Sequence, residues 1–191
     1  MTPTPIKHKF RNHEINPATR CLIIGTFNPD TPKNTADFFY GTGRNDLWSL
    51  LPAAFGVEGH LKGKNRNPER LRFMRERGID FVDIISEVMV DTDRAHHRKD
   101  SYIGGRVSVW RDVTGLMDEL PNLERACFTR KTFNDVPGIE DHVKKIASYC
   151  DGNNARNKRI VFRCLVSPSR LAPGKDKQKE WSAFFSESAI V

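Results

Sequence analysis

The sequence lacks any apolar run approaching the length of about 18 residues that a transmembrane helix needs. Residues 1–9 contain no apolar stretch of the kind found in secretory signals. Internal repeats and low-complexity tracts are also missing. We therefore expect a cytoplasmic protein with no membrane partner, folded as a single domain over residues 1–191.

Cysteine is scarce, and its four copies never show the C-x-x-C spacing of zinc ribbons and ferredoxin-like clusters. Cys21, Cys127 and Cys164 lie in or beside short apolar runs, where thiols pack as small core hydrophobes. We expect these side chains to be buried, and we expect neither a metal site nor a cofactor.

Acidic residues are fewer than basic residues. Lys and Arg together number 31 against 24 Asp and Glu, which gives a formal net charge of +7 and a pI near 9.4. More than half of the cations are arginines, whose guanidinium groups pair with phosphates and stack on bases. The excess of positive charge favours an anionic partner, and nucleic acid is the first candidate. Alternatively, the charge serves only to keep the protein soluble.

Short apolar runs alternate with helical patterns along the chain. The runs are typical of strands buried on both faces, and they cover residues 21–24, 79–85, 126–129 and 160–166. Helical spacing is found at residues 45–55, 67–74, 109–120, 136–149 and around Trp181, Phe184 and Phe185. This order predicts an α/β three-layer sandwich with a central, mostly parallel four-stranded sheet and helices on both faces. Residues 1–20 are predicted to be irregular, and residues 91–106 to form a charged loop.

Two strand ends carry distinctive polar sequences. Residues 25–29 follow the first strand and open a long loop that extends to Gly43, while residues 167–170 follow the last strand. Ligands of parallel sheets bind beyond the carboxyl ends of the strands, and long loops in compact domains are usually functional. We therefore predict that these two segments meet at one site.

Five segments in this order resemble those of the uracil-DNA glycosylase superfamily, nearest its branches for mismatched uracil or thymine and for hypoxanthine. The five segments are Gly25-Thr26-Phe27-Asn28-Pro29, Phe39-Tyr40-Gly41-Thr42-Gly43-Arg44-Asn45-Asp46-Leu47-Trp48, Gly78-Ile79-Asp80-Phe81-Val82-Asp83, Phe128-Thr129-Arg130-Lys131-Thr132 and Val166-Ser167-Pro168-Ser169-Arg170. They extend over most of the chain. The four-cysteine pattern of some branches is absent, so the resemblance implies no iron–sulfur cluster.

The resemblance implies a monofunctional, metal-independent DNA glycosylase that hydrolyses the N-glycosidic bond of a flipped deaminated base, uracil or hypoxanthine. Its partner would be duplex or single-stranded DNA, and we expect a monomer, associated with the nucleoid if the source is bacterial. Two alternatives stay open. One is a nucleic-acid-binding protein without catalysis on the same fold, and the other is a nucleotide- or nucleoside-processing hydrolase.

The same resemblance assigns roles to individual residues. Asn28 or Asn45 would hold the attacking water, with Asn28 favoured because it precedes Pro29 at a strand end. The base would be bound by Phe27, Phe39, Tyr40 and Thr129, since aromatic rings stack on flipped bases. DNA would be held by Arg44, Ser167, Pro168, Ser169 and Arg170.

Several of these residues also have a purely structural interpretation. Asn28-Pro29 is a common way to open a turn, Phe39 could belong to the core, and residues 167–170 could be a plain connection to a helix. Asp83 lies inside an apolar run, where a carboxylate needs hydrogen-bond partners, and we favour a structural role for it. The chain also departs from the family pattern, because Phe27 and Thr129 replace the polar residues usual at those positions.

Overall fold

A computed structural model describes residues 3–91, 100–134, 136, 138–152, 154, 157–172 and 176–186. Its centre is a parallel sheet of four strands in the order β3-β2-β6-β7. The strands are β2 (Cys21–Gly25), β3 (Ile79–Asp83), β6 (Arg125–Phe128) and β7 (Val161–Cys164). The predicted α/β class and four-stranded parallel sheet are therefore confirmed.

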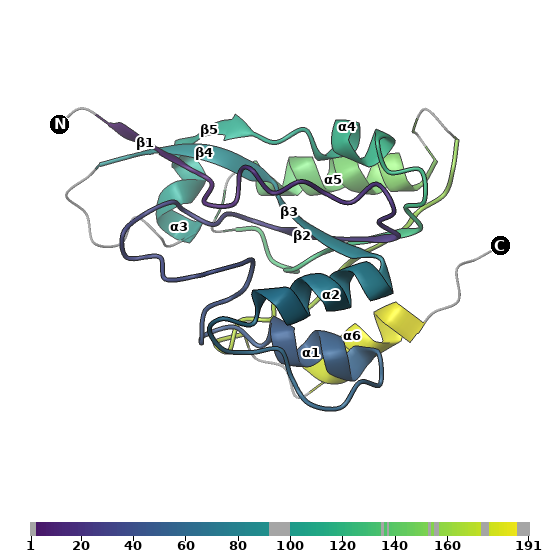
Figure 1. The fold of residues 1–191 in the computed structure, drawn as a ribbon. Coiled ribbons are helices and arrows are strands. Elements are labelled where there is room, and N and C mark those ends of the chain that lie inside the picture. The colour runs from purple at the N-terminus through teal and green to yellow at the C-terminus, as the bar shows by residue number, and fades with distance from the viewer. Residues whose placement is uncertain are drawn as a thin grey trace.

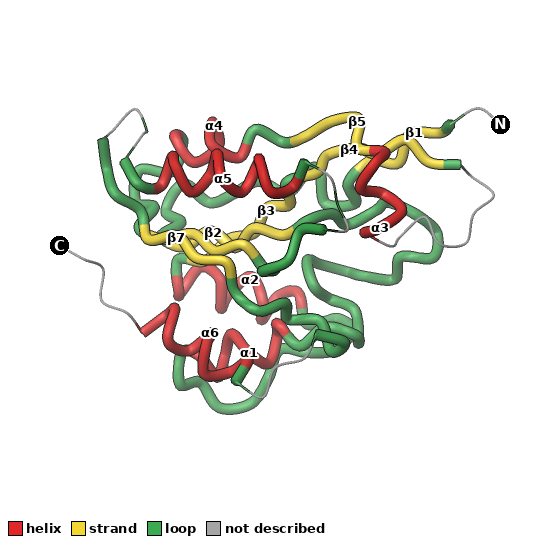
Figure 2. The backbone as a smooth tube through the Cα atoms, turned by 180° about the vertical axis from the view of Figure 1, so that it is seen from behind, coloured by secondary structure: helices red, strands yellow, loops and turns green. Residues whose placement is uncertain are grey.

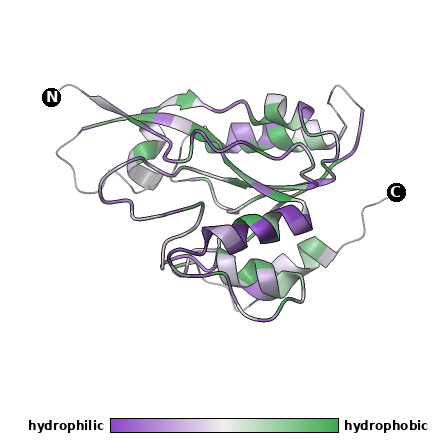
Figure 3. Cartoon of the chain, viewed as in Figure 1, coloured by the Kyte–Doolittle hydropathy of each residue, from purple (hydrophilic) through white to green (hydrophobic). Residues whose placement is uncertain are grey.

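Helices cover both faces of this sheet (Figure 1). The helices below it in that view are α1 (Leu47–Ala54), α2 (Asn67–Arg77) and α6 (Lys177–Ser186), and those above it are α4 (Val113–Asp118) and α5 (Ile139–Cys150). The view from behind shows the same three layers (Figure 2). Among these helices α2 is strongly hydrophilic in Figure 3, and it buries only Arg70, Phe73 and Met74.

Alternation along the strands divides the core into two clusters. Leu22 and Ile24 of β2 point to the cluster that contains Met117 of α4 and Val143 of α5. Their neighbours Cys21 and Ile23 point to the opposite cluster, which contains Leu51 of α1, Met74 of α2 and Trp181 of α6. A strand with apolar residues on both faces is what the continuous apolar run at residues 21–24 predicts.

A second, antiparallel sheet lies beside the first and was not predicted. It consists of β1 (Thr4–Lys7), β4 (Ile85–Val90) and β5 (Val107–Trp110) in the order β1-β4-β5. The chain turns at Ile84, so the apolar run 79–85 supplies β3 and the first residue of β4. The prediction of an irregular segment over residues 1–20 is thus wrong for Thr4–Lys7, which pairs with β4.

Two further predictions need correction. The helical spacing at residues 109–120 belongs to a helix only from Val113 onward, because Val109 lies in β5 and Asp112 caps α4 by accepting a hydrogen bond from the Gly115 amide (3.1 Å). The charged loop predicted at 91–106 contains the short helix α3 (Asp100–Ile103) and a 3-10 turn, Gly104–Arg106. Residues 92–99 lie outside the described part of the chain.

The cysteines are free thiols. Cys21 and Cys127 are buried as expected, and so is Cys150, but Cys164 is only partly buried, which corrects the expectation for that residue. Burial raises the pKa of Cys21 to about 12 and that of Cys150 to about 12, so both are protonated at neutral pH. Within the described ranges, no helix is both long and apolar enough to cross a bilayer.

Candidate functional site

A cavity of about 450 Å³ lies at the carboxyl end of the parallel sheet. Four strand ends line it: residues 26–28 after β2, Asp83 at the end of β3, residues 129–132 after β6, and residues 166–167 after β7. Tyr40, from the long loop, completes the wall. The prediction that the segments after the first and last strands meet at one site is therefore confirmed.

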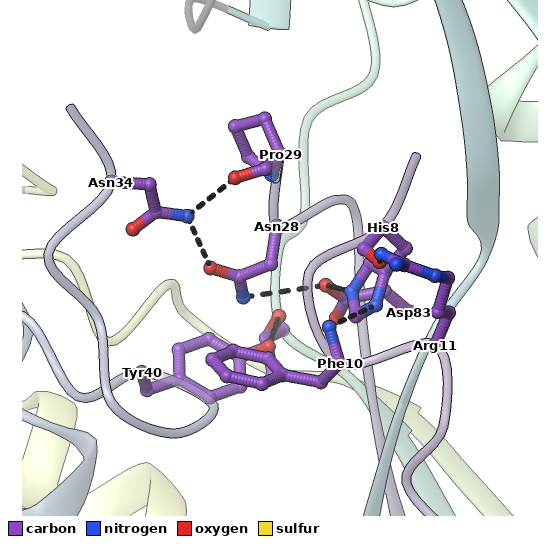
Figure 4. Close-up of polar contacts among 9 residues, drawn as sticks. His8, Phe10, Arg11, Asn28, Pro29, Asn34, Tyr40 and Asp83 are labelled. Carbon is purple, nitrogen blue, oxygen red and sulfur yellow. Dashed lines mark hydrogen bonds and ion pairs between the residues drawn. The ribbon is translucent and has the colours of Figure 1, made fainter. Parts of the chain in front are cut away.

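Asn28 lines this cavity with its carboxamide held on two sides. Its Nδ2 donates to Oδ2 of Asp83 (3.4 Å), and its Oδ1 accepts from Nδ2 of Asn34 (3.5 Å). Asn34 also donates to the carbonyl oxygen of Pro29 (2.8 Å) and so braces the loop that carries Asn28. Figure 4 shows the amide between Asn34 and Asp83, beside the ring of Tyr40. Both contacts of the Asn28 side chain are long, so the amide can bind a further polar group in the cavity.

Asp83 is the buried carboxylate of the site, with a side chain only 2% exposed. Its Oδ2 lies 2.7 Å from Nε2 of His8, a side chain that is 1% exposed. His8 comes from the segment after β1, whose Lys9 amide donates to the carbonyl oxygen of Asn28 (2.7 Å). The N-terminal segment therefore fixes both Asp83 and the Asn28 loop, a role that sequence reasoning missed.

Tyr40 and Gly25 form a tightly packed part of the wall. Tyr40 has a backbone φ of 55°, a left-handed conformation that is uncommon for a residue with a side chain. Its hydroxyl shares a hydrogen bond of 2.8 Å with that of Thr129. A Cβ atom at Gly25 would overlap the Tyr40 hydroxyl and the Asp83 carboxylate, so glycine is required for this close approach.

The aromatic residues divide into two groups. Phe27 and Tyr40 line the cavity, and the ring of Phe27 lies 6.0 Å from that of His8. Phe39, expected to bind the base, is instead 2% exposed and stacks on Phe81 with ring centroids 5.6 Å apart. It does not line the cavity, which agrees with the core interpretation.

Asn45, the second candidate for holding water, also lies away from this cavity. Its Oδ1 accepts a hydrogen bond from the Leu47 amide (2.9 Å) and so fixes the start of α1. It lines a different cavity of about 220 Å³, together with Lys62 and Lys64. Only Asn28 of the two is placed beside Asp83.

The residues expected to hold DNA form a pair of adjacent loops. The Arg170 amide donates to the carbonyl oxygen of Arg44 (3.0 Å), and the Asp46 amide donates to that of Pro168 (2.8 Å). Between these bonds Asn45 pairs with Ser169 as an isolated antiparallel bridge. Ser167 lines the cavity, Pro168 is buried, and the side chains of Arg44 and Arg170 are exposed. The paired loops thus bring all five predicted DNA-binding residues to one side of the site.

Asp46 holds the two loops and a nearby lysine together. Its Oδ1 accepts from Nε of Arg170 (3.1 Å) and from Nζ of Lys62 (2.5 Å). Partial burial acts to raise the pKa of this carboxyl, but the hydrogen bonds and charges of Lys62 and Arg170 outweigh it and lower the pKa below its ordinary value. Asp46 is therefore ionised at neutral pH and clamps Arg170.

Leu171 is a feature that sequence reasoning missed. It follows Arg170 directly, and its side chain is 87% exposed, the most exposed large hydrophobic residue among those described. Arg130 and Lys131 also line the cavity, and Lys131 forms an ion pair of 2.6 Å with Glu180.

The chemical groups at the cavity are an amide, a carboxylate with its histidine, hydroxyls and aromatic rings. Among the described residues, no group of three or more His, Cys, Asp and Glu is arranged to hold a metal ion. No protein-family model matches this chain, and no curated protein matches it either.

Proposed function

We propose that this protein is a DNA glycosylase that hydrolyses the N-glycosidic bond of a flipped deaminated base, uracil or hypoxanthine. The observation that carries the proposal is the cavity at the carboxyl end of the sheet, where Asn28, Asp83, Phe27 and Tyr40 converge. Its volume of about 450 Å³ falls within the range of about 300–1,000 Å³ usual for small-molecule sites. A base and its sugar would fill such a space.

The polar groups suit the charge that develops in this reaction. Breaking the bond leaves positive charge on the sugar and negative charge on the departing base, so the site needs an anion on one side and hydrogen-bond donors on the other. Asp83 supplies the anion, and Asn28 next to it supplies an oxygen that can orient a water molecule. Phe27 and Tyr40 offer ring faces on which a flipped base can stack.

The surroundings of the cavity suit a nucleic-acid substrate. Arg44 and Arg170 are exposed on the paired loops and can contact phosphates on either side of a flipped nucleotide. Leu171 can enter the space that the base vacates, since inserted apolar side chains stabilise unstacked steps. Such a wedge has no function in an enzyme that acts on free nucleotides.

The proposal is tested with end-labelled oligonucleotides, single-stranded and duplex, that carry one uracil, one hypoxanthine or one mismatched thymine. Alkali cleaves the strand wherever a base has been removed, so we expect a single new band from the uracil or hypoxanthine strand. Binding without cleavage on every substrate would contradict the proposal and favour a non-catalytic DNA-binding protein. Hydrolysis of free nucleotides with intact oligonucleotides would favour the nucleotide hydrolase.

A further inference from the structure

We propose that Asp83 is a catalytic residue of this site, which accepts a proton from the attacking water, and that His8 is the positioning residue that fixes its carboxylate. The inference rests on the proposed function and names the group that carries the charge in the reaction. It replaces the structural role that the sequence favours for Asp83. The evidence for this inference is the different surroundings of the two carboxylate oxygens of Asp83.

The hydrogen bonds around His8 assign its proton. Nδ1 accepts a hydrogen bond from the Phe10 amide (3.1 Å), so Nδ1 carries no proton and the proton of the neutral ring is on Nε2. Nε2 therefore donates to Oδ2 of Asp83 (2.7 Å), and Asn28 donates to the same oxygen (3.4 Å). Two donors on one oxygen are the environment of an ionised carboxylate.

The second oxygen of Asp83 is left for the cavity. Both hydrogen bonds described for this side chain go to Oδ2, and Oδ1 is not one of the described side-chain atoms that are sealed from solvent without a partner. Asp83 lines the cavity, and this oxygen lies over Gly25, where the missing side chain makes room for it. A carboxylate oxygen at the wall of a cavity can accept a hydrogen bond from water or from a ligand.

A second histidine–aspartate pair on the same strand shows what a structural pair looks like in this protein. Asp80 lies three residues before Asp83, and its Oδ1 contacts Nε2 of His13 (2.6 Å) and accepts from the Phe81 amide (2.8 Å). Its Oδ2 accepts from the Asn16 amide (2.9 Å). Both oxygens of Asp80 are satisfied by the protein, and Asp80 lines a different cavity. Asp83 differs in keeping one oxygen open to the proposed site.

The step that follows is a hydrolysis with water as the co-reactant. The water oxygen forms a bond to the sugar C1′ while the bond from C1′ to the base nitrogen breaks. The electron pair of that bond leaves with the base, which takes up one proton from solvent. The charge of Asp83 stabilises the cationic sugar until Oδ1 accepts one proton from the water, and Asp83 then returns that proton to solvent.

The test compares single-turnover excision rates of the full chain and its variants on the best oligonucleotide substrate. We expect Asp83→Asn, which keeps the shape and can still accept from His8, to slow excision about a hundredfold or more, with a dissociation constant for DNA within about threefold of wild type. Asp80→Asn is the matched control. It should lower the melting temperature yet leave the excision rate within about threefold.

Two variants of His8 test its positioning role. His8→Gln can still donate from the position of Nε2 and should retain more of the rate than His8→Leu, which removes the donor. Adding formate to Asp83→Ala should restore part of the rate, because a small carboxylate can occupy the vacated space. A structural role for Asp83 predicts no rescue by formate.

The outcomes separate the two proposals. An active wild type with an unchanged rate in Asp83→Asn, or with an equal loss in Asp80→Asn, overturns the role of Asp83 and leaves the glycosylase proposal standing. A wild type that removes no base from any substrate overturns both. A large loss confined to Asp83→Asn, with DNA binding intact, supports the inference.

Discussion

Gly25 is the residue at which the packing of the site is tightest, because both Asp83 and Tyr40 lie against its Cα. Gly25→Ala introduces a Cβ that must displace both of them, and overpacking of this kind destabilises by about 1–3 kcal/mol. Gly43→Ala is the matched control, since a Cβ there meets nothing within 4 Å. Urea unfolding should show a loss of stability for Gly25→Ala only. Equal unfolding midpoints for the two variants would contradict the packing described here.

The two asparagines at the site should respond differently to replacement by alanine. Asn28→Ala removes a cavity-lining amide, and we expect excision to slow about a hundredfold with little change in stability. Asn45→Ala removes the acceptor for the Leu47 amide and should destabilise by about 1 kcal/mol without changing the chemical step. Single-turnover rates and urea midpoints measure both effects. The opposite assignment of the two effects would show that Asn45 holds the water.

Sequence reasoning at the residue scale succeeded where local context determines the position of a side chain. Asn28 directly follows a buried strand, so its place at the carboxyl edge could be predicted. His8 could not, because its partner Asp83 lies 75 residues away and the surrounding segment is polar without periodicity. Phe39 and Tyr40 are adjacent in sequence, and only the left-handed backbone at Tyr40 shows which of the two rings reaches the cavity.

At the scale of elements, the paired loops 44–46 and 168–170 depend on the ionised carboxylate of Asp46. Its pKa is lowered in the folded protein, so its contribution to stability is present above the unfolded value of about 3.9 and is lost as the pH falls through the lower folded value. Asp46→Asn should destabilise by about 0.5–1 kcal/mol at pH 7, in line with a partly exposed ion pair. The difference in unfolding free energy between Asp46→Asn and wild type, measured in urea, should shrink toward pH 3. A difference that does not change with pH would show that the charge of Asp46 is not its cause.

The strands of the parallel sheet could be predicted because their apolar runs are continuous. A strand that is buried on both faces has apolar residues at successive positions, without the alternation of a half-exposed strand. The antiparallel sheet could not. Thr4–Lys7 exposes three of its four residues, and Val107–Trp110 has Val109 spaced from Val113 as on one helix face. In the structure Val109 is 46% exposed, and the helix begins only after Asp112. Both Thr4–Lys7 and Val107–Trp110 are strands because they pair with β4, and the sequence of neither segment alone indicates this tertiary contact.

For the whole molecule, the excess positive charge should appear in the salt dependence of DNA binding. We expect phosphate contacts from seven cations. The structure describes Arg44, Lys62, Lys64, Arg66, Arg170 and Lys177, while Lys175 lies outside the described residues. Contacts to about four phosphates would give a slope of about −3.6 for log K against log salt on duplex DNA. Fluorescence anisotropy over a salt series measures it. An affinity that does not change with salt would exclude a phosphate-binding surface.

The most direct measurement of base excision is the identity and amount of what leaves the DNA. A duplex with one uracil or one hypoxanthine is incubated with the protein, and the free base and the abasic strand are quantified by mass spectrometry. The proposed reaction predicts one free base for each abasic site, released about a hundredfold more slowly by Asn28→Ala. DNA that is bound and recovered intact, with no free base from either substrate, would contradict it.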